Sequence, residues 1–139
     1  MRTSQFLLLD TCAMIFIAEG AAMSAEAMRL IEAADQTGNI FVSPISAWEI
    51  GKAVASETLS INVPPLDYFR SFVLNAGAII CEMGPEILVG SSFLPGKAHK
   101  DPMDRILIET ARRNNFTLVT RDRAILAYGA EGHVKTLAC

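Results

Sequence analysis

The stretches Phe6–Asp10 (FLLLD) and Phe116–Asp122 (FTLVTRD) share one pattern, a short apolar run followed within two residues by an aspartate. A continuous apolar run of this length is typical of a strand buried on both faces, as in a parallel sheet. The carboxyl ends of parallel strands meet at one edge of the sheet, where functional groups collect. We therefore expect Asp10 and Asp122 to lie at the same edge, although an aspartate in this position often serves only to cap the next helix.

Strands and helices alternate along the rest of the chain. Strands are predicted over residues 6–9, 39–43, 78–83, 116–120 and 133–137. Helices are predicted over residues 12–19, 24–37, 44–57, 66–76, 86–91, 103–114 and 121–129. This alternation favours an α/β fold with a central, mainly parallel sheet. The 139 residues suit a single domain, 1–139, with a core of its own.

Composition narrows the class of protein. Hydrophobic residues make up 51% of the chain, but the longest apolar runs are interrupted by charge well before the roughly 18 residues of a membrane-spanning helix. The start of the chain does not resemble a signal peptide, so we expect a cytoplasmic protein with no membrane partner. Cys12, Cys81 and Cys139 are scattered, a spacing that favours small buried side chains over a disulfide framework or a zinc site.

Charge is distributed unevenly. The formal net charge of −3 argues against a protein that coats nucleic acid along its whole surface. Seven of the 12 Lys and Arg residues nevertheless lie between residues 97 and 123, at Lys97, Lys100, Arg105, Arg112, Arg113, Arg121 and Arg123. A local basic surface near that segment is compatible with this distribution.

The segment DPMDR, residues 101–105, holds two aspartates with different predicted roles. Proline disfavours helical geometry in the residue before it and suits the first position of a helix. Asp101 is therefore predicted to cap a helix that starts at Pro102. Asp104 falls in the first turn of that helix and can point toward the strand ends. We expect Asp104 to take part in chemistry and Asp101 to stabilise the helix.

Glu49 lies in a predicted helix among apolar neighbours such as Trp48 and Ile50. A carboxylate in such surroundings is costly to bury unless it is paired, protonated or close to a cation. The alternative is that Glu49 faces solvent beside Lys52. If Glu49 joins Asp10, Asp104 and Asp122, four carboxylates repel each other unless a cation lies between them.

Oxygen ligands without cysteine or histidine favour a hard divalent ion, Mg²⁺ or Mn²⁺. Such ions bind substrate phosphates, so the natural chemistry is phosphodiester hydrolysis by an activated water. Arg105, Arg121, Lys97 and Lys100 are placed to hold the flanking phosphates of a nucleic acid. His99, in the same basic loop, either touches a phosphate or is a plain surface residue.

These residues resemble the PIN-domain family and, within it, the VapC-type toxins of bacterial toxin–antitoxin pairs. The resemblance covers essentially the whole chain, through residues 7–20 (LLLDTCAMIFIAEG), 43–61 (SPISAWEIGKAVASETLSI) and 99–129 (HKDPMDRILIETARRNNFTLVTRDRAILAYG). It implies a three-layer α/β/α fold and a ribonuclease that depends on Mg²⁺ or Mn²⁺. Relatives often carry histidine where Cys12 stands, which changes little because that position is not one of the acids.

The resemblance also implies roles for individual residues. The four catalytic acids would be Asp10, Glu49, Asp104 and Asp122. Asp10 and Asp104 would bind the metal directly, with Asp122 and Glu49 completing the cluster through the ion or its waters. The supporting residues would be Thr11 and Thr120, which orient acids or water, and Arg105 at the rim. The implied partners are an RNA substrate, a cognate antitoxin that lies across the active-site groove, and a second copy of the chain in a homodimer.

Two other readings remain open at the level of sequence. A receiver-type phosphoacceptor domain also uses an acidic cluster and Mg²⁺ at strand ends. It requires paired acids after its first strand and a lysine after a late strand, and neither LLLDTC nor LVTRDR supplies them. A PIN-like binding module that has lost catalysis is the other alternative, and the presence of all four acids does not favour it.

Overall fold

A five-stranded sheet, in the order β3-β2-β1-β4-β5, forms the centre of the protein. The structure is a computed structural model that describes residues 5–139. The strands are β1 (Leu7–Leu9), β2 (Ile40–Val42), β3 (Ile79–Ile80), β4 (Thr117–Thr120) and β5 (Lys135–Ala138). All four pairings between neighbouring strands of this sheet are parallel. The predicted parallel α/β sheet is confirmed, and the FLLLD stretch supplies its middle strand.

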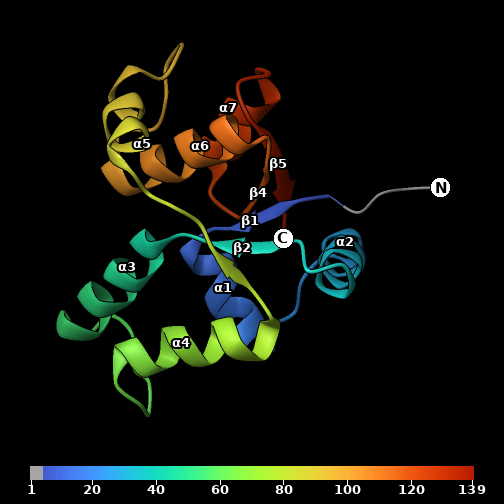
Figure 1. Ribbon diagram of the computed structural model, residues 1–139, viewed down its shortest axis with the longest axis vertical. Helices are drawn as coiled ribbons and strands as arrows, with labels where there is room; N and C mark the ends of the chain where they lie inside the picture. Colours follow the sequence, from blue (N-terminus) through green and yellow to red (C-terminus); the bar gives the residue numbers. More distant parts are fainter. Residues whose placement is uncertain (1–4) are drawn as a thin grey trace.

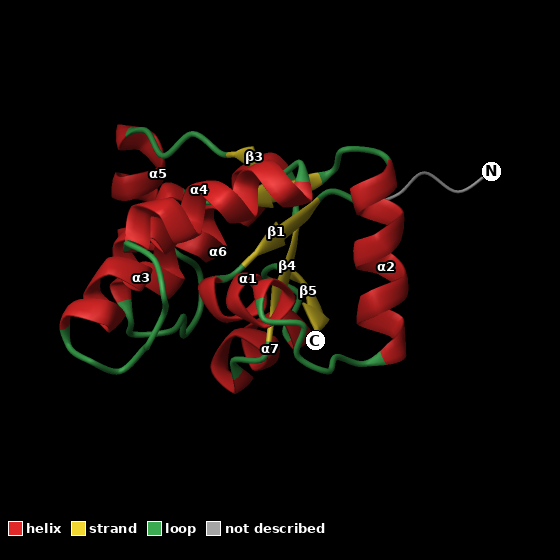
Figure 2. Ribbon diagram, turned by 90° about the horizontal axis from the view of Figure 1, so that it is seen from below, coloured by secondary structure: helices red, strands yellow, loops and turns green. Residues whose placement is uncertain are grey.

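Helices cover both faces of this sheet, which gives three layers (Figures 1 and 2). They are α1 (Thr11–Ala18), α2 (Ala25–Gln36), α3 (Pro44–Ala55), α4 (Pro65–Ala76), α5 (Pro85–Gly90), α6 (Pro102–Asn114) and α7 (Arg123–Ala130), with a 3-10 helix at Ser91–Phe93 after α5. Proline begins four of them, where its missing N–H costs no hydrogen bond. Among residues 5–139, none of the helices has the length and apolar character needed to cross a bilayer.

Strand β1 explains why the apolar run at residues 7–9 is uninterrupted. Successive side chains of a strand point to opposite faces. Leu7 and Leu9 pack into the core with α1, α2 and α4, whereas Leu8 packs into a second core with α6 and α7. All three leucines are fully buried, and each contributes roughly 2 kcal/mol of transfer free energy. The middle of the sheet is therefore fixed from both sides, and the residue that follows β1 is held firmly in place.

Some local predictions are wrong at the periphery. The strand predicted over residues 78–83 is a two-residue edge strand, β3, in which Ile79 is 48% and Ile80 is 46% exposed. Cys12, which was expected to be buried, is exposed at the start of α1. Met28 of α2 is exposed as well. These residues are apolar in sequence, but none of them lies where two layers meet.

Candidate active site

Asp10 and Asp122 lie beyond the carboxyl ends of the neighbouring strands β1 and β4, so the prediction that they share one edge is confirmed. The backbone N–H of Asp10 donates to the carbonyl of Val119 at 3.0 Å, which extends the pairing of β1 with β4 by one step. Thr120 Oγ1 donates to Asp10 Oδ2 at 2.6 Å and accepts the backbone N–H of Asp122 at 3.0 Å. One buried hydroxyl therefore ties the two aspartates together.

Both aspartates also cap helices. Asp10 Oδ1 accepts the backbone N–H of Ala13 at 2.7 Å at the start of α1, and Asp122 Oδ1 accepts that of Ile125 at 2.9 Å at the start of α7. Capping and chemistry were alternatives in the sequence, but a carboxylate oxygen can accept more than one hydrogen bond. The caps fix the orientation of each carboxylate and leave Asp122 Oδ2 available to face the other acids.

Helix α6 brings Asp104 to the same edge. Asp101 caps this helix as predicted, with Oδ1 accepting the backbone N–H of Met103 at 2.9 Å, and Pro102 takes the first helical position. Asp104 lies in the first turn, where Oδ2 is 3.3 Å from His99 Nε2. Asp122 Oδ2 lies 3.3 Å from the same nitrogen. His99 Nε2 and one oxygen each of Asp104 and Asp122 lie within 4.8 Å of one another, and no other group of three His, Cys, Asp or Glu side chains among the described residues is this close.

Glu49 approaches from α3 and is held by Thr11. Thr11 Oγ1 donates to Glu49 Oε1 at 2.5 Å and makes a second hydrogen bond, 2.9 Å long, with Ser46 Oγ. Ser46 is fully buried. The sequence pointed to Thr11 but not to Ser46, because a serine one helical turn before an acid is also common on solvent-facing helices. Asp10 and Glu49 lie outside the three-residue group and interact with it electrostatically.

Three of the acids hold their protons more strongly than usual. Burial raises the pKa of Asp104 to about 7, with further repulsion from Asp101, Asp122 and Glu49, and with His99 acting in the opposite direction. Burial likewise raises the pKa of Asp10, although the Thr120 and Ala13 hydrogen bonds oppose this effect. The pKa of Glu49 is raised by burial too, and the Thr11 hydrogen bond opposes it. Desolvated carboxyl groups that repel one another are the arrangement that a cation would relieve.

Among the residues of this site, His99 is the one whose surroundings were predicted least well from the sequence. It was expected to touch a phosphate or to lie on the surface. Its ring instead lies against Asp104 and Asp122, and Nδ1 accepts the backbone N–H of Asp101 at 2.9 Å. The one signal in the sequence is its spacing, two residues before the capping aspartate, and spacing alone does not show which way the ring turns.

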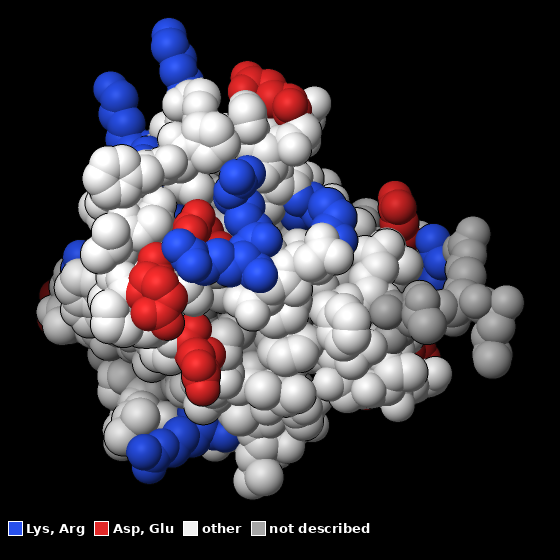
Figure 3. Space-filling view, turned by 45° about the horizontal axis from the view of Figure 1, so that its top comes forward, with Lys and Arg blue, Asp and Glu red and all other residues white. Residues whose placement is uncertain are grey.

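Arg105 and Arg121, each next to one of the acids in sequence, donate hydrogen bonds to backbone carbonyls. Arg105 donates from Nε to Ser91 O at 2.8 Å and from Nη1 to His99 O at 3.0 Å. Arg121 donates to the carbonyls of Cys139 and Ala22 at 2.9 and 2.6 Å. Both therefore hold segments of chain around the site, and their contact with phosphate stays a prediction. Figure 3 shows acidic and basic side chains lying side by side on one face.

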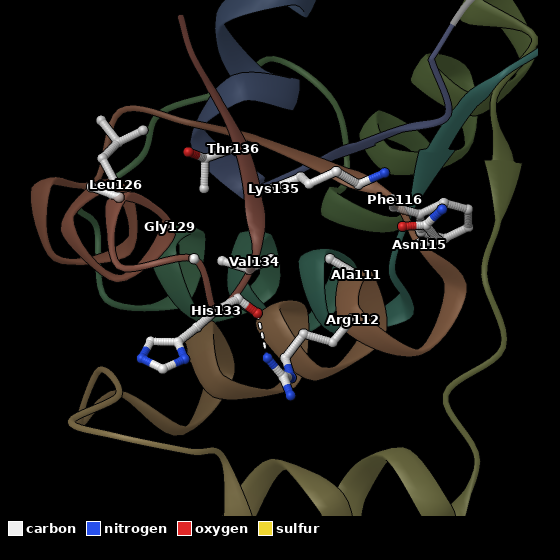
Figure 4. Close-up of a pocket in the computed structure, with 12 residues that line it drawn as sticks. Ala111, Arg112, Asn115, Phe116, Leu126, Gly129, His133, Val134, Lys135 and Thr136 are labelled. Atoms are coloured by element: carbon white, nitrogen blue, oxygen red, sulfur yellow. Dashed lines mark hydrogen bonds between the residues drawn. The ribbon is translucent and has the colours of Figure 1, made fainter.

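A separate pocket of about 640 Å³ lies at the amino ends of β4 and β5, the edge of the sheet opposite to the acids (Figure 4). It is bordered by the end of α6 and by the segment before β5, and Arg112 crosses it to donate to the carbonyl of His133. Among the described residues that line it there is neither aspartate nor glutamate. It offers no carboxylate for a hard cation, which leaves the acidic edge as the candidate site.

Known proteins resemble this chain in sequence. The sequence model of one family, described as the PIN domain, matches residues 7–131. A curated relative, Ribonuclease VapC22 of Mycobacterium tuberculosis, is 27% identical over 111 residues, which cover 80% of this chain and 82% of the relative.

Two solved structures are similar in fold. VapBC2 from Rickettsia felis, bound to a DNA fragment from its promoter, aligns with a TM-score of 0.68 at 14% identity, over 95% of this chain and 97% of that chain. PAE2754 from Pyrobaculum aerophilum aligns with a TM-score of 0.58 at 20% identity, over 90% of this chain and 85% of that chain. At these identities the similarity establishes the three-layer fold alone.

Proposed function

The chain belongs to the PIN-domain family, and on that basis we propose that it is a metal-dependent endoribonuclease of the VapC type, the toxin of a toxin–antitoxin pair. The observation that carries the proposal is the convergence of carboxylates at one edge of the sheet. Asp104 and Asp122 face each other across His99, and Thr120 links Asp122 to Asp10. The relative named a ribonuclease covers most of the chain and supports the same reaction class.

The donor set fits a hard divalent cation. Asp10, Asp104 and Asp122 would hold the ion through carboxylate oxygens, the ligands that Mg²⁺ and Mn²⁺ prefer. The raised pKa of Asp104, caused by burial and by neighbouring acids, shows that the negative charge at this edge is poorly compensated by the protein itself. When bound, a divalent ion would supply the charge that polarises a phosphodiester and makes water a stronger nucleophile.

Glu49 and Thr120 would contribute to the reaction beside the ion. Glu49 combines a raised pKa with a fixed orientation, since burial favours its protonated form and Thr11 holds one oxygen. A fixed carboxylate with a raised pKa is a stronger base than a solvated one, which suits a group that accepts a proton from an attacking water. Thr120 keeps Asp10 in a single orientation, so the acids need little rearrangement during the reaction.

The same proposal extends to partners and location. The substrate would be RNA in the cytoplasm, with phosphates flanking the cleaved bond held by the basic residues Lys97 and Lys100. A cognate antitoxin would cover the acidic edge, and a homodimer would bury part of the exposed apolar surface. The likeness in fold to the VapBC2 complex supports the antitoxin, whereas the dimer rests on the family resemblance.

Cleavage of a labelled RNA by the purified chain tests the proposal. We expect cleavage with Mg²⁺ or Mn²⁺, none after chelation, and none from Asp10→Asn or Asp104→Asn protein whose circular dichroism is unchanged. Cleavage that survives both chelation and these substitutions would show that a different site, or a contaminant, is responsible.

A further inference from the structure

The His99 ring makes one hydrogen bond and two close contacts with carboxylates, which together fix its orientation. Nδ1 accepts the backbone N–H of Asp101 at 2.9 Å, and Nε2 lies 3.3 Å from one oxygen each of Asp104 and Asp122. The residue's own carbonyl accepts a hydrogen bond from Arg105 at 3.0 Å. The side chains of His99, Asp104 and Asp122 are 21%, 18% and 34% exposed, so the arrangement is partly shielded from water.

The contact with Asp101 determines which nitrogen carries the proton. A ring nitrogen that accepts an N–H uses its lone pair to do so and holds no proton of its own. Neutral His99 therefore carries its proton on Nε2, where it is shared between Asp104 and Asp122. Binding a metal through Nε2 would require that proton to move to Nδ1, where it would meet the N–H of Asp101. His99 is thus a hydrogen-bond donor in this cluster and not a metal ligand.

We propose that His99 is a positioning residue, which uses Nε2–H to hold Asp104 and Asp122 in the orientation that receives the divalent ion. This inference rests on the proposed function, since it concerns the affinity of the same acidic edge for metal. Two carboxylates this close would turn apart if nothing lay between them. The shared N–H offsets part of their repulsion in the absence of a cation. Substituting partners of metal-binding carboxylates typically weakens metal binding 10- to 100-fold.

Two substitutions distinguish this role from one limited to the hydrogen bond with Asp101. In His99→Gln the side-chain amide nitrogen reaches about as far as Nε2, so the donor to the acids is kept and the acceptor for Asp101 is lost. In His99→Asn the amide oxygen reaches about as far as Nδ1, so the acceptor is kept and the donor is lost. If His99 acts as a donor to the two acids, His99→Gln should keep the metal affinity. If it acts only as the acceptor for Asp101, His99→Asn should keep it.

Titration of the full-length chain with Mn²⁺ by calorimetry is the first experiment. We expect His99→Gln to bind Mn²⁺ within about threefold of the wild type and His99→Asn to bind it about tenfold more weakly. His133→Asn, at the opposite edge of the sheet, should match the wild type. Wild-type affinity in His99→Asn with weak binding in His99→Gln would overturn the inference. A wild-type chain that binds no Mn²⁺ would instead contradict the proposed function.

Nitrogen NMR of histidine-labelled protein tests the inference without metal. The chain has only two histidines, and the His133→Asn variant assigns the signals. We expect His99 to show a protonated Nε2 and an unprotonated Nδ1, both in metal-free protein and after addition of Mg²⁺. A proton on Nδ1 in either state would contradict the donor role, whatever the calorimetry shows.

Discussion

Thr120 donates a 2.6 Å hydrogen bond to Asp10, and both side chains are buried where β1 and β4 end side by side. Replacing Thr120 with Val keeps the shape of the side chain and removes this donor. A charged acceptor left without its partner in a buried site costs about 2 kcal/mol. We expect Thr120→Val to lower the free energy of unfolding by about that amount at pH 8, measured by urea denaturation. Thr120→Ser, which keeps the hydroxyl, should stay close to the wild type.

Asp101 and Asp104 should respond in opposite ways to substitution. Asp101→Ala removes the cap of α6 and is expected to cost about 1 kcal/mol of stability while RNA cleavage continues. Asp104→Asn should abolish cleavage and leave the helix intact, because asparagine has nearly the same size. Cleavage rates and thermal melts of the two proteins provide the comparison. Loss of cleavage in Asp101→Ala at temperatures where it is folded would contradict the division of roles.

The metal-free protein should lose stability as pH rises. Burial and nearby acids raise the pKa of Asp104 to about 7 from its ordinary value of 3.8, so between these values the folded state binds more protons than the unfolded state. The free energy of unfolding then falls as pH increases through that range. Asp10 and Glu49, whose pKa values are also raised by burial, act in the same direction.

Urea denaturation in a chelator, repeated from pH 4 to pH 8, measures this dependence. Asp104→Asn should flatten the curve, by at most roughly 4 kcal/mol across the range. A wild-type curve that rises with pH over this interval would show that Asp104 is ionised and stabilised by the protein alone.

Thr11 should matter for catalysis more than for metal binding. Thr11→Val removes the hydrogen bond to Glu49, which leaves that carboxylate free to rotate. Because Glu49 is not one of the three acids proposed to hold the ion, we expect Mn²⁺ affinity to change little and the cleavage rate to fall roughly tenfold. Single-turnover cleavage with saturating metal makes the measurement, and Thr11→Ser is the matched control.

Arg105 should stabilise the loop that carries His99. Arg105→Lys replaces two directed donors with one ammonium group, which cannot satisfy Ser91 O and His99 O together. We expect a loss of about 1–2 kcal/mol and faster hydrogen exchange over residues 91–99. Arg123→Lys, an exposed arginine of α7, should change neither quantity. Equal effects in the two variants would mean that the loop does not depend on Arg105.

The sequence predicted the parts of the site that local rules control. The uninterrupted apolar runs located β1 and β4, and the proline after Asp101 located the start of α6, because these patterns allow few other local structures. The orientation of His99 could not be predicted, since it depends on contacts with Asp104 and Asp122 that arise only after α6, β4 and the loop have packed. Ser46 was missed for the same reason, as its burial depends on α1 lying against α3.

The peripheral errors have a different origin. The character of a core residue is shared by Ile79, Met28 and Cys12. Their exposure follows from where they lie in the fold, with Ile79 on an edge strand and Met28 and Cys12 at exposed positions of helices. Such positions are set by the number of strands and the arrangement of layers. Neither is visible in the few residues around each site.

The contact between Thr120 and Asp10 joins positions 110 residues apart. Strand β4 pairs with β1 and leads into Asp122, so the acidic edge cannot assemble until residues 117–122 have been synthesised. At a translation rate of roughly 5–20 residues per second, most of the nascent chain exists for several seconds without an assembled acidic edge. Under the proposed function, a chain that ends before residue 120 would lack this edge and would not cleave RNA.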